Sequence, residues 1–186
     1  GLGDEGVDLF PVMAERHPKL PSPHWYLAHA RLSRGDPRAA ADAFARFVEI
    51  LPDYAEGWRL LGESRLTAGQ YEETAEAVGA LLEIEEQEGA ALDLLLSLVR
   101  TMAATGKVQA AAAILDRFEA SFPMHAGWAT VRADLSFMDG DYERAVETYL
   151  RALRSLRSTG FSAPVVVEVK LEKAATALRR MGRDPG

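Results

Sequence analysis

The side chains most able to support catalysis or hold a metal do not form a pattern that defines an active site. The four histidines are His17, His24, His29 and His125, and no two of them form an HExxH or HxxxH pair. His24 and His29 are five residues apart, which turns them away from a common helical face. The chain has no cysteine, so a thiol nucleophile, a zinc–thiolate site and a disulfide are excluded.

A short acidic segment comes nearest to a metal-binding motif. Asp139-Gly140-Asp141, followed by Glu143, resembles the start of a calcium loop, but the twelve-residue ligand pattern is missing. A turn between two helices explains the segment fully. The sequence also lacks a phosphate-binding glycine loop and a nucleophile motif. We therefore expect no catalytic residue, no metal, no cofactor and no enzyme activity.

Composition and charge narrow the classes of partner. The chain has 186 residues, of which 28 are acidic and 21 basic, and its net charge is -7. This acidic balance argues against nucleic acid as the main partner, because phosphate neutralisation needs a basic face. No apolar run approaches the roughly 18 residues of a membrane-spanning helix. The sequence is compatible with a soluble protein of either the cytoplasm or the periplasm. Because the chain begins Gly1-Leu2-Gly3 without an initiator methionine, we expect a fragment of a longer protein.

Charge is unevenly distributed along the chain. The segment from Leu66 to Val99 carries eight acidic residues and no basic one, whereas from Arg151 onward basic residues predominate. One interpretation is that the two segments steer partners or promote head-to-tail association, which would form a homo-oligomer through the ends of the molecule. The other is a charged face that only keeps the protein in solution.

Glycines recur at a spacing typical of a repeat. Gly35, Gly69, Gly106 and Gly140 are separated by 34, 37 and 34 residues. In every unit two small or compact residues lie twelve positions apart, one on each predicted helix. Small residues at these positions allow the two helices to approach closely. These pairs are Ala28 and Ala40, Gly62 and Thr74, Val99 and Ala111, and Ala133 and Ala145. Large apolar residues follow each pair on one helical face.

Each unit therefore predicts a helix, a turn with glycine at the helix end, and a second antiparallel helix. In Gly35-Asp36-Pro37, Asp36 is placed to cap the next helix and Pro37 to begin it. We expect helices near 22–34 and 37–51, 55–68 and 71–87, 90–105 and 107–121, and 125–138 and 141–157. The predicted repeats are 22–52, 55–88, 90–123 and 125–157, flanked by a partial repeat at 6–17 and a terminal helix or cap at 163–182.

These residues resemble the tetratricopeptide repeat family, over nearly the whole chain. Trp58-x-x-Leu61-Gly62 matches the opening of the family's pattern, and Ala40-x-x-x-Phe44 with Pro52 matches its middle and end. The resemblance implies an all-α fold, a right-handed superhelical α-solenoid of antiparallel helix pairs. It also implies that the first helices line a concave groove that binds peptides and proteins. Abundant alanine and arginine suggest a bacterial source.

The sequence departs from the pattern in three places. Three extra residues between Gly69 and Gly106 are best placed at 85–89, where they would lengthen the second helix. Arg132 occupies the position of Leu27, Leu61 and Leu98, while Trp128, Val131, Leu135 and Met138 form an apolar stripe shifted by one, so that helix is expected to be rotated. Residues 158–164 read as a loop. Val165-Val166-Val167 suit a strand locally, but later apolar spacing favours a helix from about 163.

Helical spacing selects the first-helix residues that would face the groove. The predicted partner-binding residues are Trp25, His29, Arg59, Glu63, Leu96, Arg100, Thr130, Asp134 and Phe137. Trp25 either packs in the core or lines the groove, and Arg59 with Glu63 is alternatively a surface ion pair. Arg100 and Asp134 alternatively pair across neighbouring helices. The chain has no asparagine, which argues against the chaperone-tail clamp of one branch of the family.

Two functional hypotheses follow. The first is a non-catalytic scaffold that binds a peptide or a partner-protein segment in its groove. The second is a regulatory or targeting module of a larger multidomain protein, for example one fused to a transferase or a regulator, and capable of self-association.

Overall fold

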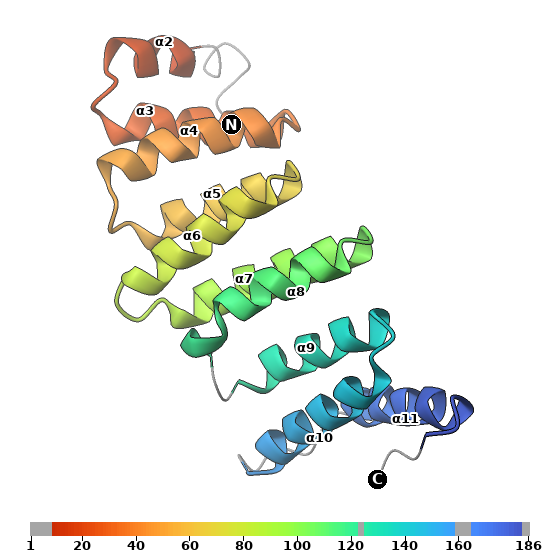
Figure 1. Ribbon diagram of the computed structural model, residues 1–186. Helices are drawn as coiled ribbons and strands as arrows, with labels where there is room; N and C mark the ends of the chain where they lie inside the picture. Colours follow the sequence, from red (N-terminus) through yellow and green to blue (C-terminus); the bar gives the residue numbers. More distant parts are fainter. Residues whose placement is uncertain (1–8, 123–124, 159–164, 184–186) are drawn as a thin grey trace. The chain divides into compact units, whose positions relative to one another are not determined.

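The computed structural model describes residues 9–122, 125–158 and 165–183. Within these ranges it contains ten α-helices, one short 3-10 helix and no strand (Figure 1). By its internal contacts the chain divides into two compact units, Gly1–Leu95 and Leu96–Gly186, and the division falls inside a helix. In the described residues no helix is long and apolar enough to cross a bilayer. The helices are α2 (Leu9–Arg16), α3 (Pro21–Ser33), α4 (Pro37–Ile50), α5 (Ala55–Thr67), α6 (Tyr71–Glu83), α7 (Glu88–Ala104), α8 (Val108–Arg117), η1 (Glu119–Ser121), α9 (Ala126–Met138), α10 (Tyr142–Ser158) and α11 (Val165–Arg180).

Each first helix ends in the same hydrogen-bonded glycine turn. Gly35 has a φ of 74°, a left-handed conformation that side chains disfavour. Its N–H donates to the carbonyl of Leu32 at 2.9 Å, and the N–H of Asp36 donates to Arg31 at 3.0 Å. This arrangement satisfies carbonyls that the helix end would leave unpaired. The same pair of bonds recurs at Gly69, Gly106, Gly140 and Gly182.

Aspartates begin two of the second helices. Asp36 Oδ1 accepts the N–H of Ala39 at 3.0 Å, with Pro37 at the first position of α4, as predicted. Asp141 Oδ1 accepts the N–H of Arg144 at 3.1 Å. The segment 139–141 is therefore an inter-helix turn, and no cluster of three or more potential metal ligands occurs among the described residues.

In the first unit, α3 and α4 pack closely through small residues. Ala28 and Ala40 are fully buried where the two helices meet, and Phe44, Phe47 and Leu61 build the core above them. The next pair, α5 and α6, brings Gly62 beside Ala77 and beside Leu94 of α7. A side chain at 62 would force these helices apart, which explains the preference for a compact residue there.

In the second unit, α10 packs on both α9 and α11. The buried core joins Ala133 of α9, Ala145 and Tyr149 of α10, and Val167 and Ala174 of α11. The helix expected from about 163 is confirmed from Val165 on, because Val167, Ala174 and Leu178 bury one helical face. The expected loop lies outside the described residues from 159 to 164, and so do residues 6–8 of the predicted N-terminal segment.

The extra residues between Gly69 and Gly106 do not lengthen the second helix, so that expectation is wrong. Helix α6 ends at Glu83, and a turn follows in which Glu86 has a φ of 62°. The added length goes into this turn and into α7, which begins at Glu88. Helix α8 is also shorter than predicted, because it ends at Arg117 before η1.

The shifted stripe of the last first helix is only partly correct. Trp128, Val131 and Leu135 are buried, but Met138 is 51% exposed. Arg132 stays at the buried leucine position and is 6% exposed. An ion pair with Asp116 makes this burial tolerable, because a buried charge needs a partner.

Two glycine substitutions test the packing of the first unit. In Gly62→Ala the new Cβ would lie 3.2 Å from Ala77 Cβ and still closer to Leu94, so we expect a loss of about 1–3 kcal/mol in unfolding free energy. In Gly79→Ala no described atom lies within 4 Å, so we expect a gain of about 0.5–1 kcal/mol. Denaturant unfolding measures both, and equal effects would contradict the packing described.

Candidate functional site

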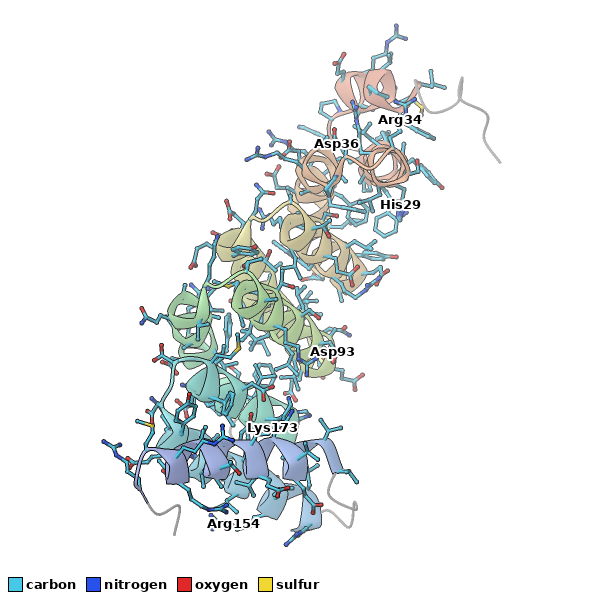
Figure 2. The ribbon with its side chains drawn as sticks, turned by 90° about the vertical axis from the view of Figure 1, so that its right-hand side faces the viewer. His29, Arg34, Asp36, Asp93, Arg154 and Lys173 are labelled. Carbon is cyan, nitrogen blue, oxygen red and sulfur yellow. The ribbon has the colours of Figure 1, made fainter. Side chains whose placement is uncertain are left out.

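Aromatic rings gather on α3 and on the turn before α5. The Trp25 ring lies 4.8 Å from His29, 4.8 Å from Phe47 and 5.7 Å from Tyr54. Trp25 is half-buried, whereas His29 and Tyr54 are exposed. Trp25 thus packs on the core and also contacts the exposed rings of His29 and Tyr54. Figure 2 shows His29 on α3.

A chain of ion pairs continues this surface on α5. Arg59 donates to both carboxylate oxygens of Glu56, at 2.7 and 2.5 Å, and also to Glu63. The hydrogen bond from Arg59 lowers the pKa of Glu56, and the charges of Arg59 and His29 lower it further against the effect of burial. The same bond raises the pKa of Arg59. The predicted surface ion pair between Arg59 and Glu63 is confirmed, and Glu56 extends it.

We call this surface the α3–α5 patch and define it as Trp25, His29, Tyr54, Glu56, Arg59 and Glu63. Trp25 and His29 come from the first helix of one repeat, Tyr54 from the turn that follows that repeat, and the charges from the first helix of the next. Tyr54 and Glu56 are not among the nine predicted partner-binding residues. The helical spacing that selected Arg59 also selects the residue three before it, so Glu56 had a signal, whereas Tyr54 precedes the helix and had none.

In the second unit, Asp134 joins three helices. Tyr149 donates its hydroxyl to Asp134 Oδ1 at 2.5 Å, and Lys170 Nζ lies 2.6 Å from Oδ2. The predicted alternative in which Asp134 pairs with Arg100 is therefore wrong, since α11 supplies the cation. Burial, and then the bond to Asp134, raise the pKa of Tyr149.

A hollow of about 300 Å³ lies beside this network. Asp134, Phe137, Tyr149, Lys170 and Lys173 line it, together with Met138. Phe137 packs edge-on against Tyr142 with the ring centres 5.2 Å apart. The hollow therefore combines apolar side chains with two ammonium groups from α11. Helical spacing within the repeats did not predict these two lysines.

The remaining predicted residues contribute unequally to an exposed surface. Leu96 is only 8% exposed and lies against Gly127 of α9, so it offers little area to a partner. Arg100 is exposed on α7. Thr130 is half-buried and donates its hydroxyl to the carbonyl of Ala126 at 2.9 Å. Helical spacing selects one face of each first helix, but it does not separate the exposed positions of that face from the packed ones.

The Tyr149 hydroxyl tests the three-helix network. Tyr149→Phe removes a hydrogen bond to a carboxylate, so we expect the free energy of unfolding to fall by about 1.5 kcal/mol. Tyr142→Phe on the same helix should change it by less than about 0.5 kcal/mol. Urea unfolding at pH 7 measures both values, and similar losses in the two variants would argue against the network.

The raised pKa of Tyr149 predicts a dependence of stability on pH. Above about pH 10 the unfolded chain loses the phenolic proton while the folded protein keeps it, so the free energy of unfolding falls as pH rises. Below that pH the stabilisation is fully present. Unfolding curves between pH 8 and 11 should show a steeper decline for the unsubstituted protein than for Tyr149→Phe. Equal slopes would show that Tyr149 titrates normally.

Comparisons with known proteins agree with the helix pairs. The described fold is similar to a crystal structure of MamA protein with a TM-score of 0.55 at 15% identity, covering 84% of each chain. A second crystal structure of MamA gives a TM-score of 0.54 at 15% identity, over 84% of this chain and 90% of that chain. These identities support the fold alone. No curated protein matches the chain.

A sequence profile of the tetratricopeptide repeat matches residues 27–96 and again residues 96–158. The match spans α4 to α10 and the second half of α3, where four of the glycine turns and the buried small residues lie. The profile, the helix pairs and their turns lead to one conclusion: the chain belongs to the tetratricopeptide repeat family.

Proposed function

We propose that the protein is a non-catalytic scaffold that binds a segment of a partner protein on its first-helix faces. Tetratricopeptide repeats serve in general as protein-interaction scaffolds, which supports the proposal at the level of the family. The observation that carries it for this chain is the α3–α5 patch, where a supported aromatic edge lies beside exposed charges. Aromatic residues and arginine dominate binding energy when a partner removes their water.

The chemistry of the patch indicates what the partner presents. Glu56 and Glu63 place two carboxylates around the single guanidinium of Arg59, so this part of the surface has a negative excess. Trp25 and Tyr54 offer apolar ring area next to it. A segment with an apolar anchor followed by lysine or arginine fits this arrangement, because the basic group can share the carboxylates.

The hollow on α9 and α11 suits the opposite arrangement. Phe137 supplies the apolar contact and Lys173 an exposed ammonium, while Asp134 is already occupied by Tyr149 and Lys170. An apolar anchor with a neighbouring acidic residue fits there. The proposed roles of the predicted residues thus differ: Phe137 contacts the partner, and Asp134 positions Lys170.

Photo-cross-linking tests the proposal. A benzoyl-phenylalanine placed at His29 should cross-link a partner from lysate, whereas the same group at Asp42, which is exposed on α4, should not. With the captured partner, Glu56→Gln should weaken binding about tenfold, a loss of ~1.4 kcal/mol, because the partner's basic group loses a carboxylate.

Glu49→Gln is the matched control, since Glu49 also pairs with an arginine three residues away, at 2.9 Å, but lies on α4. Circular dichroism confirms that both variants fold. Equal cross-linking from the two positions, or undiminished binding by the Glu56 variant, would overturn the first-helix assignment.

A further inference from the structure

A second hollow in the Leu96–Gly186 unit has four arginines among its ten lining residues. Its volume is about 360 Å³, and it lies between α9 and α10 beside η1. Two helical faces build it: positions 125, 128 and 132 along α9, and positions 144, 148, 151 and 155 along α10. We call it the arginine pocket and define it by His125, Trp128, Arg132, Arg144, Arg151 and Arg154.

The charge of the pocket is unbalanced. Four arginines line it, and Glu119 is the one carboxylate among the described lining residues. Asp116 does not line the pocket but pairs with Arg132. Even when both Glu119 and Asp116 are counted, the four guanidinium groups exceed the carboxylates by two. Arg144, Arg151 and Arg154 are exposed at its rim, and Figure 2 shows Arg154 on α10. In this otherwise acidic protein the local excess is positive.

Arg132 is the buried element of the pocket. It is 6% exposed, and its guanidinium carbon lies 4.7 Å from the centre of the Trp128 ring. Nη1 pairs with Asp116, and Nη2 lies 3.8 Å from Glu119, which is too far for a hydrogen bond. Nε and Nη2 of Arg132 and the indole Nε1 of Trp128 have no hydrogen-bond acceptor among the described residues. Three buried donors are thus unsatisfied at one site, which native structures rarely tolerate.

We propose that the arginine pocket binds a small organic anion through phosphate or carboxylate oxygens. The Nε and Nη2 groups of Arg132 form the edge of a guanidinium that can donate to two oxygens of one oxyanion. Thr148 adds a hydroxyl on α10, and the rim arginines neutralise the remaining charge. A volume of about 360 Å³ fits one small ligand, since small-molecule sites measure about 300–1,000 Å³.

This site is separate from the proposed partner surface. Thr130 and Asp134 lie two positions after Trp128 and Arg132 respectively, which is about 200° around the helix axis, and Phe137 lies five positions after Arg132, which is about 140°. The other three repeats carry leucine at the position of Arg132 and need no ion pair there. Arg132 is therefore not required to build a repeat. The proposal therefore stands or falls independently of partner binding.

Isothermal titration calorimetry of the full chain with pyrophosphate and with citrate, at pH 7.5 and constant ionic strength, tests the proposal. Pyrophosphate represents phosphate ligands and citrate carboxylate ligands, so the stronger binder identifies the class. We expect binding of at least one, with the dissociation constant raised at least tenfold by Arg132→Leu and severalfold by Arg151→Gln. Arg179→Gln, on the exposed end of α11, is the matched control and should bind as the unsubstituted chain does.

Nuclear magnetic resonance supplies a second readout. The indole N–H signal of Trp128, identified by its loss in Trp128→Phe, should shift on titration, while those of Trp25 and Trp58 should not. If Arg132→Leu fails to fold, Arg151→Gln and this signal decide the question. Absence of binding by both anions, an unchanged Trp128 signal, or equal weakening by Arg179→Gln would overturn the proposal.

Discussion

The left-handed glycine turn is the constraint on which the rest of the structure depends. Each first helix must stop and reverse within about three residues, and its last carbonyls must still find donors. At Gly35 and Gly140 the backbone reaches φ values of 74° and 83°, which lets the next two N–H groups fold back onto the helix end. The reversal places the following helix against the first, so the buried small residues can meet. Packing within each unit follows from this geometry.

Close approach of paired helices leaves little room for polar groups. The second unit nevertheless buries Arg132 at the position where the other repeats carry leucine, and it holds Asp134 half-buried between three helices. Asp134 is satisfied by Tyr149 and Lys170, and it ties α9, α10 and α11 together. Arg132 is paired with Asp116 but keeps unsatisfied nitrogens. The difference between the two is informative. A fully satisfied network stabilises the fold, whereas the unsatisfied donors of Arg132 are the observation on which the proposed anion site rests.

On the exposed surface, too, neighbouring groups hold side chains in place. In the α3–α5 patch, Trp25 is held by the core rings and Arg59 by two carboxylates, so both are presented in one arrangement. Such preorganised side chains lose little freedom when a partner binds. Such preorganisation supports the proposed recognition of a partner by this surface.

The sequence alone determined the helix pairs, their glycine turns and the buried small residues, because each depends on neighbours within about 34 residues and on backbone conformation. It did not determine where the extra residues before α7 go, since a turn and a longer helix satisfy the same pattern. The tertiary structure also decided which face residues stay exposed. Leu96 is buried, Asp134 is paired from α11, and Arg132 is paired with Asp116 of α8, because side chains from different helices meet there. Periodicity reports the face of a helix, but only the packed neighbours decide what that face can bind.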